Sequence, residues 1–205
     1  MRVVAIDGPV GSGKSTVAKA VAARLGLPYL ESGAMYRVVA LAAVRQGIDP
    51  AAEGSAAAIT ALAGDLKMDV GERVLLDGDD VTSELRSPDV GRAVSPVAAM
   101  AGVRTELVRR QREWVADHGG AVVEGRDIGS VVFPDAELKV FLTASAAERA
   151  RRRHQDETAD DLARRDLLDS TRATSPLIVP DGAVVVDTTA RPIDDVVDEI
   201  LALLP

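Results

Sequence analysis

The feature that most constrains this chain is a glycine-rich segment, residues 8–15, which fits the pattern Gly-x-x-x-x-Gly-Lys-Ser/Thr. An apolar run at residues 3–6 precedes it and apolar residues at helical spacing follow it, so it joins a strand to a helix. Glycines permit backbone conformations in which successive N–H groups line an anion cradle at the positive end of that helix. An ordinary glycine-rich turn is the alternative, but the flanking strand and helix favour a phosphate loop that binds a nucleoside triphosphate.

Two side chains of this loop have specific expected roles. Lys14 would reach the terminal phosphates, and the Ser15 hydroxyl would ligate Mg²⁺. The predicted cofactors are therefore ATP, as the bound nucleoside triphosphate, and Mg²⁺. The residues expected to contact ATP are Gly8, Pro9, Val10, Gly11, Ser12, Gly13, Lys14, Ser15 and Thr16.

Length and composition limit the class of protein. The chain has 205 residues, enough for one domain with excursions or for two domains at most. It has no run of about twenty apolar residues, so no membrane partner is predicted. Its net charge of −8 argues against nucleic acid as a bulk partner, and the lack of cysteine excludes disulfides and thiolate metal sites. Because no secretion signal is recognised and ATP is needed, we expect a cytoplasmic protein.

Short apolar runs alternate with helical patterns along the chain. The runs that indicate buried parallel strands lie at residues 3–6, 28–31, 121–124, 138–142 and 183–187. The helical patterns lie near residues 14–25, 33–46, 103–117, 145–153 and 192–203. This alternation predicts an α/β fold with a doubly wound, five-stranded parallel sheet. Ligands of such folds gather at the carboxyl ends of the strands, which Gly8, Ser32 and Arg126 follow directly.

Two segments interrupt the alternation. Residues 64–91 contain two short strand patterns separated by a turn, which predicts an antiparallel hairpin; a surface ornament without a role is the alternative. An alanine-rich helix over residues 51–63 precedes it. Residues 149–172 hold seven arginines among six acidic residues. They form either a mixed-charge helical pair on the surface or a mobile lid whose arginines close over phosphates.

Four further motifs carry a resemblance to a known family. They are Glu-Ser-Gly-Ala-Met-Tyr-Arg at 31–37, Asp-Val-Thr at 80–82, Glu-Gly-Arg-Asp-Ile-Gly-Ser-Val-Val-Phe-Pro-Asp-Ala at 124–136, and Asp-Ser-Thr-Arg at 169–172 with Ser-Pro-Leu at 175–177. Together with the phosphate loop, and in the same order, they resemble the bacterial cytidylate kinases. The resemblance implies ATP-dependent phosphorylation of CMP and dCMP to CDP and dCDP, by direct in-line transfer, in pyrimidine nucleotide metabolism. It also implies a monomer with small-molecule substrates.

The resemblance further implies a domain organisation. Residues 1–205 would form a single phosphate-loop kinase domain of the nucleoside-monophosphate kinase type. Residues 64–98 would be an inserted monophosphate-binding α+β subdomain, and the hairpin falls where this insert begins. Residues 149–172 would form a short lid.

Most of the candidate substrate residues also follow from the resemblance. Those expected to hold the acceptor phosphate are Arg37, Arg126 and Arg172. Those expected to contact the cytosine are Ser32, Ser95, Arg104 and Asp127, and those expected to contact the sugar are Arg165 and Asp169. Guanidinium groups suit this task because they bind phosphate with two fixed hydrogen bonds, and a carboxylate can accept from the cytosine amino group. The predicted catalytic residues are Lys14, Arg126 and Arg172, which would stabilise a loose, anionic transition state without a covalent intermediate.

The sequence departs from the family in two places. Only ten residues separate Arg153 from Arg164, where typical members carry a longer helical excursion, so the lid arginines and Arg165 align poorly. Many relatives have Lys-Gly-Thr at the end of the phosphate loop, whereas this chain has a serine before the threonine. Either Ser15 or Thr16 could therefore supply the hydroxyl for the metal.

Several assignments have alternatives. Ser95 precedes a proline and could be a helix cap, and Asp127 could instead form an ion pair with Arg126. Glu124 could orient a water bound to Mg²⁺ or cap the Gly125 turn. A kinase of another small acceptor, a nucleotide-switch ATPase and an inactive relative are the alternative functions.

Overall fold

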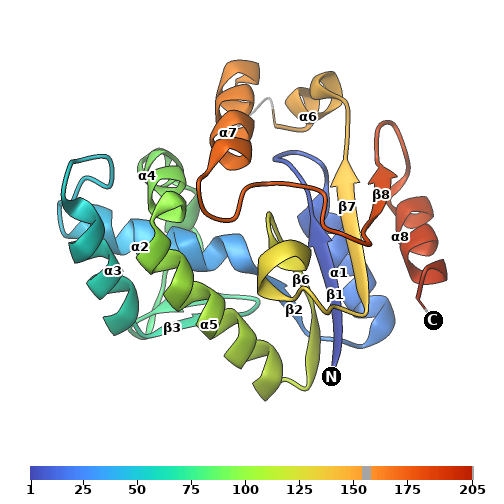
Figure 1. The fold of residues 1–205 in the computed structure, drawn as a ribbon, viewed down its shortest axis with the longest axis horizontal. Helices are drawn as coiled ribbons and strands as arrows, with labels where there is room; N and C mark the ends of the chain where they lie inside the picture. The colour runs from blue at the N-terminus through green and yellow to red at the C-terminus, as the bar shows by residue number, and fades with distance from the viewer. Residues whose placement is uncertain (154–157, 205) are drawn as a thin grey trace. The chain divides into compact units, whose positions relative to one another are not determined.

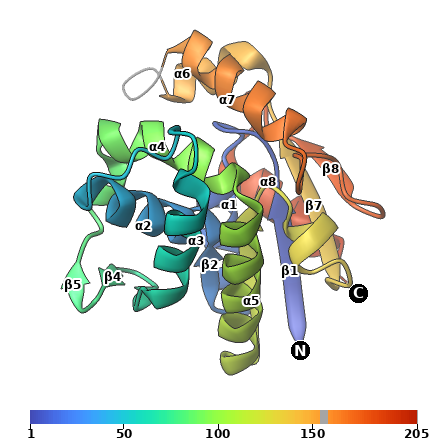
Figure 2. The same ribbon diagram turned by 60° about the vertical axis from the view of Figure 1, so that its left-hand side comes forward.

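A computed structural model describes residues 1–153 and 158–204 (Figures 1 and 2). The chain divides into two compact units. The first unit combines Met1–Leu30 with Val115–Pro205, and the second is Glu31–Trp114. Each unit has its own sheet and helices, and each is described by itself below.

The sheet of the first unit has the parallel, doubly wound arrangement that the sequence predicts. Its described strands lie in the order β2-β6-β1-β7-β8. Their bounds are β1 Arg2–Asp7, β2 Tyr29–Glu31, β6 Gly120–Gly125, β7 Leu138–Thr143 and β8 Val184–Asp187. β1 pairs in parallel with both β6 and β7, and β7 pairs in parallel with β8. All predicted strands are confirmed, and the central position of β1 places the phosphate loop in the middle of the sheet's carboxyl edge.

Two helices cover one face of this sheet with apolar side chains (Figure 1). α1, Lys14–Leu25, ends at Gly26 in the left-handed conformation, and α8, Ile193–Ala202, begins after Pro192. Both ends agree with the sequence-based prediction, because glycine tolerates a positive φ and proline starts helices well. The core residues that these helices share with the strands include Val17, Val21, Val196, Val197, Ile200, Ile6, Val140 and Leu142.

The rest of the first unit follows β6 and β7. A single π-helical turn, η2 (Ile128–Val132), lies directly after β6, and α6 (Ala146–Arg153) follows β7. α7, Ala159–Thr171, begins with a capping box in which Thr158 and Asp161 bond each other's backbone N–H groups. The helical pair predicted over 149–172 is thus present as α6 and α7. Residues 154–157 of the predicted lid lie outside the described residues, and the lid role stays a prediction.

The second unit, described throughout, consists of helices and a small sheet that lies at one side of them (Figure 2). Its elements are α2 Ser32–Arg45, α3 Ser55–Asp65, β3 Met68–Val70, β4 Val74–Leu76, β5 Asp79–Asp80, η1 Glu84–Arg86, α4 Pro88–Ala99 and most of α5 Ala101–Asp117. β4 pairs antiparallel with both β3 and β5, which confirms the predicted hairpin and adds a third strand. Whether residues 64–98 act as a monophosphate-binding subdomain remains a prediction.

Two sequence-based expectations in this unit need correction. The alanine-rich helix begins at Ser55 and not at residue 51, because Gly54 has a left-handed φ of 81°, which a helix cannot include. Ser95 is not a helix cap: it lies inside α4, a helix that the sequence analysis did not assign. The cap is Ser87, which accepts from Val90 N and is followed by a proline in the first turn.

A close approach between α3 and α5 depends on one glycine. A Cβ atom at Gly102 would lie 2.5 Å from Cγ2 and 2.6 Å from Oγ1 of Thr60. Because a β-branched side chain in a helix has little rotamer freedom, Thr60 cannot easily turn away. The spacing of these two helices therefore requires glycine at this position.

We expect Gly102→Ala to lower the free energy of unfolding by about 1–3 kcal/mol through this overlap. Urea denaturation followed by circular dichroism would measure the loss. The double variant Gly102→Ala with Thr60→Ala should recover much of it, since the overlapping atoms are gone. Gly64→Ala, at a helical glycine with nothing within 4 Å of the new Cβ, is the matched control and should not destabilise. Equal losses in both single variants would contradict the prediction.

Candidate functional site

The phosphate loop lies between β1 and α1 and has a conformation that requires glycine. Gly8, Gly11 and Gly13 have φ angles of 150°, 77° and 88°. A Cβ at Gly8 would lie 2.1 Å from the carbonyl oxygen of Leu142, so no other residue fits there. Within the described part of the chain, no side chain caps the first N–H groups of α1. Helix N-termini of this kind bind anions, because their N–H groups and the helix dipole both favour negative charge.

Lys14 is the buried cation of this loop. Its side chain is nearly inaccessible, and Nζ donates to the carbonyl oxygen of Pro9 at 2.8 Å. Burial, with a smaller effect from the charge of Arg126, lowers the pKa of Lys14 to about 7, and the charges of Glu124, Asp7 and Asp169 act in the opposite direction. A phosphate bound beside Lys14 would favour the charged form of the lysine and raise its pKa.

Two of the predicted phosphate-binding arginines share one carboxylate. Arg126 Nε lies 2.8 Å from Asp169 Oδ2, and Arg172 Nη2 lies 3.2 Å from Asp169 Oδ1. Burial opposes ionisation of Asp169, but the charges of Arg126 and Arg172, with a smaller effect from Arg165, hold its pKa below the ordinary value. The structure thus brings Arg126, Asp169 and Arg172 together. The expected alternative, an ion pair of Arg126 with Asp127, stays a prediction, and the ion pair that the structure shows for Arg126 is with Asp169.

Glu124 is the next-to-last residue of β6, and its side chain is buried. The Tyr29 hydroxyl on neighbouring β2 donates to Glu124 Oε1 at 2.8 Å. This contact fixes the carboxylate near Lys14, whose pKa Glu124 raises. The sequence analysis did not include Tyr29, because only the pairing of β2 with β6 brings the two residues together.

Asp7 is a second residue that the sequence analysis missed. It is 1% exposed, and its Oδ1 and Oδ2 accept from the N–H groups of Ile128 and Gly129 at 2.8 and 2.7 Å. Burial raises the pKa of Asp7 to about 6, although both N–H groups act in the opposite direction. The signal in the sequence was an acidic residue at the end of an otherwise apolar strand, immediately before the phosphate loop.

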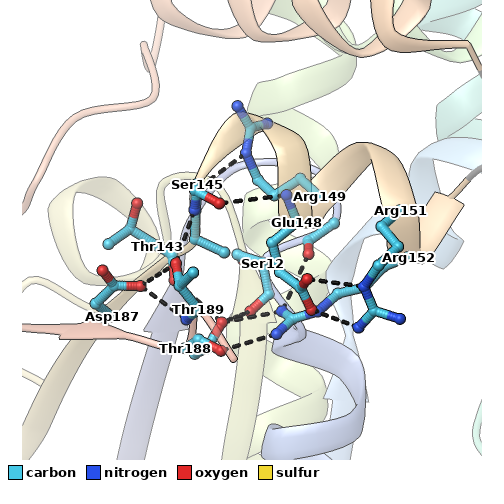
Figure 3. Close-up of polar contacts among 12 residues, drawn as sticks. Ser12, Thr143, Ser145, Glu148, Arg149, Arg151, Arg152, Asp187, Thr188 and Thr189 are labelled. Carbon is cyan, nitrogen blue, oxygen red and sulfur yellow. Dashed lines mark hydrogen bonds and ion pairs between the residues drawn. The ribbon is translucent and has the colours of Figure 1, made fainter. Parts of the chain in front are cut away.

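The arginines of α6 contact the outer side of the phosphate loop (Figure 3). Arg149 Nη1 donates to the carbonyl oxygen of Val10 at 3.2 Å, and Arg152 Nη1 donates to that of Gly11 at 3.4 Å. Arg152 also donates to the hydroxyl and the carbonyl oxygen of Thr188, at 3.0 and 2.8 Å. The Thr188 hydroxyl in turn lies 3.0 Å from the carbonyl oxygen of Ser12. Three successive carbonyl groups of the loop are therefore held by side chains from the end of the sheet and from α6.

Ser12 differs from its neighbours. Its side chain is completely buried, and within residues 1–153 and 158–204 its hydroxyl has no hydrogen-bond partner. A buried hydroxyl of this kind normally has a partner, so the position is suited to a ligand atom or a water molecule. Ser15 and Thr16, the two candidate metal ligands, are exposed in the first turn of α1, and the structure does not distinguish between them.

The remaining candidate residues lie in the second unit. Arg104, which is 2% exposed, donates to the carbonyl oxygen of Ala98 at 3.1 Å, and its guanidinium lies 5.4 Å from the centre of the Tyr36 ring. Arg37 donates to the carbonyl oxygen of Leu85 at 3.2 Å. The structure thus brings Arg104 together with Tyr36, an aromatic residue of the 31–37 motif to which the sequence analysis gave no role. Ser32 is the buried first residue of α2, and Ser95 is half-buried in α4.

A family model described as cytidylate kinase matches residues 4–205. The cytidylate kinase of Mycobacterium avium is 50% identical over 98% of this chain and 94% of the relative, and that of Pelotomaculum thermopropionicum is 47% identical over 97% and 94%. Among solved structures, a Thermus thermophilus protein has a TM-score of 0.53 at 17% identity, covering 100% of this chain and 98% of its own. The shikimate kinase of Acinetobacter baumannii has a TM-score of 0.50 at 15% identity, covering 99% and 92%; both structures support the fold alone. The chain belongs to the cytidylate kinase family.

Proposed function

We propose that this chain transfers the terminal phosphoryl group of ATP to CMP or dCMP, giving ADP and CDP or dCDP. The observation that carries the proposal is the proximity, within the first unit, of a phosphate loop and a pair of arginines. β1 pairs in parallel with β6, with Asp7 opposite Gly125, so the phosphate loop that follows β1 and Arg126, which follows β6, leave the same edge of the sheet side by side. A donor phosphate on the loop and an acceptor phosphate on the arginines suit direct transfer between the two.

The loop residues fit ATP by three observations. Gly8, Gly11 and Gly13 have positive φ angles, which suit a loop whose N–H groups line an anion cradle. Among the described residues, the first turn of α1 has no side-chain cap and the buried hydroxyl of Ser12 has no partner. Residues 8–16 would therefore hold the triphosphate. Mg²⁺ would be ligated by the hydroxyl of Ser15 or Thr16, and when bound it would neutralise charge on the phosphates.

The arginines suit the acceptor phosphate because their geometry is already fixed. Asp169 holds Arg126 and Arg172 at its two oxygens, so a phosphate would meet guanidinium groups whose side-chain freedom is largely lost. Arg165 would act with Asp169 at the sugar. The residues proposed for CMP in the second unit, on the resemblance alone, are Ser32, Arg37, Ser95 and Arg104.

The chemistry proposed needs no strong base. The attacking atom is an oxygen of the acceptor phosphate, which is already ionised. Lys14, Arg126 and Arg172 would stabilise the anionic transition state by their fixed positive charges, in a site that burial keeps poor in water. Family membership favours this reaction over the kinase of another small acceptor and over a nucleotide-switch ATPase.

Specificity for cytosine would depend on Asp127, whose side chain is 5% exposed. A carboxylate accepts from the exocyclic amino group of cytosine, whereas uracil would place a carbonyl oxygen against it. An unpaired buried polar group costs on the order of 1–3 kcal/mol, which is roughly tenfold to a hundredfold in affinity. We further propose a monomeric, cytoplasmic enzyme without a nucleic-acid or membrane partner. The net charge of −8 supports the proposal that no nucleic acid is a partner.

The reaction is tested by coupled measurement of ADP release with CMP, dCMP, UMP, AMP, GMP and shikimate as separate acceptors. We expect strong turnover with CMP and dCMP, weak turnover with UMP and none with the others. Turnover with a different acceptor would contradict the assignment of Asp127 to cytosine. ADP release that is independent of any acceptor would indicate a nucleotide-switch ATPase.

We expect Arg172→Met to lower kcat/KM for CMP by roughly a hundredfold or more, because a charged group that would hold the acceptor phosphate is lost. The KM for ATP should change far less. Arg24→Met is the matched control, since Arg24 is exposed and pairs with Asp198. Steady-state kinetics with each substrate varied in turn would measure both effects. Parallel losses for CMP and ATP would contradict an acceptor-specific role.

Nucleotide binding should be coupled to proton uptake at Lys14. With a pKa of about 7 caused by burial, Lys14 is mostly neutral at pH 8 in the free enzyme. A triphosphate beside it stabilises the charged form and raises this pKa, so binding at pH 8 takes up a proton. At pH 6 Lys14 is already protonated in the free enzyme, so the proton uptake on ATP binding should be small. Calorimetry of ATP binding in buffers of different ionisation enthalpy measures the protons, and identical uptake in Lys14→Met would contradict the assignment.

A further inference from the structure

Asp7 is a buried charged residue for which the proposed chemistry has no use. It ends β1, immediately before Gly8, and is 1% exposed. Among the described residues its carboxylate forms no ion pair and instead accepts hydrogen bonds from two backbone N–H groups, those of Ile128 and Gly129. Those N–H groups lie 121 and 122 residues further along the chain. Asp7 thus connects the start of the phosphate loop to a distant turn.

The turn at residues 126–129, which Asp7 contacts, contains two residues proposed to bind CMP. Ile128 and Gly129 open η2, and Arg126 and Asp127 directly precede it. The carbonyl oxygen of Asp127 closes the same turn by accepting from the N–H groups of Val131 and Val132, at 2.9 and 3.2 Å. The position of this backbone therefore sets where the Arg126 and Asp127 side chains begin.

The chemistry of the carboxylate matches the two donors. An ionised carboxylate accepts at both oxygens, so each N–H group is satisfied by a charge-assisted bond. An asparagine would present one NH₂ group to an N–H group, and one of the two bonds would be lost. Ionisation is opposed by burial and by the charge of Asp127, and it is favoured by the charge of Lys14. The charge on the phosphate loop thus helps to keep Asp7 in the form that holds the turn.

We propose that Asp7 is a positioning residue, which holds the 126–129 turn at a fixed place relative to the phosphate loop. It acts through Arg126 and Asp127 and touches neither nucleotide. This role rests on the proposed function, because Arg126 and Asp127 are assigned to CMP there. It predicts that loss of the carboxylate weakens the acceptor side of the site more than the donor side.

The test compares Asp7→Asn with the wild-type chain in two calorimetric titrations, one with CMP and one with a non-hydrolysable ATP analogue. We expect CMP affinity to fall roughly tenfold to a hundredfold, the effect of one lost bond to a charged group, while affinity for the analogue stays within about twofold. Hydrogen exchange at the N–H groups of Ile128 and Gly129, followed by NMR, should become faster. Asp198→Asn, at an exposed carboxylate paired with Arg24, is the matched control and should leave all three measurements unchanged.

Three results separate the possibilities. Equal weakening of both ligands would overturn the positioning role, because a general structural defect has that effect. Unchanged CMP affinity with unchanged exchange would also overturn it. Failure of the wild-type chain to bind CMP would overturn the proposed function instead, and the exchange at Ile128 and Gly129 would still show whether Asp7 holds the turn. If Asp7→Asn does not fold, Asp7→Ser, which keeps one acceptor in a smaller side chain, takes its place in the same titrations.

Discussion

The burial of Lys14 behind the phosphate loop is the constraint on which the surrounding structure depends. A buried ammonium group is costly unless opposite charges lie near it. Among the described residues, the carboxylates of Glu124, Asp7 and Asp169 supply those charges, and each is itself held by other groups. Tyr29 binds the first, backbone N–H groups bind the second, and arginines bind the third. One cation at the start of α1 thus accounts for much of the polar structure along the carboxyl edge of the sheet.

Much of the fold could be predicted because its signals are local. Apolar runs and helical spacing identified every strand of the large sheet and most of the helices, since one chain segment carries each pattern. The signal for the phosphate loop was also local, because its own glycines allow its backbone conformation. Helix α4 was not predicted because Pro96 lies inside it. The predicted start of α3 was wrong because Gly54, within an alanine-rich segment, was not interpreted as the residue before the helix. In both cases the local pattern conflicts with the packing that decides the structure.

Residues of the candidate site could be predicted only where they belong to a recognisable sequence motif. The pairing of Arg126 with Asp169 joins residues 43 positions apart, and the bonds of Asp7 join residues more than 120 positions apart. Nothing in a single sequence indicates such pairs, because sheet order and turn geometry create them. The same holds for Thr188, which reaches the phosphate loop only because β8 pairs with β7. Residue types predicted the chemistry of the site, and topology determined how its parts support one another.

The side chains outside the phosphate loop also determine what its inner surface presents. In a planar trans peptide the carbonyl oxygen and the N–H group point in opposite directions. Arg149 holds the carbonyl of Val10 outward, so the N–H group of Gly11 faces the opposite way, and Thr188 does the same for the peptide between Ser12 and Gly13. The loop is therefore ordered by its own protein before any anion arrives. A phosphate would meet N–H groups whose orientation was settled when the chain folded, and the entropy of ordering them would not oppose binding.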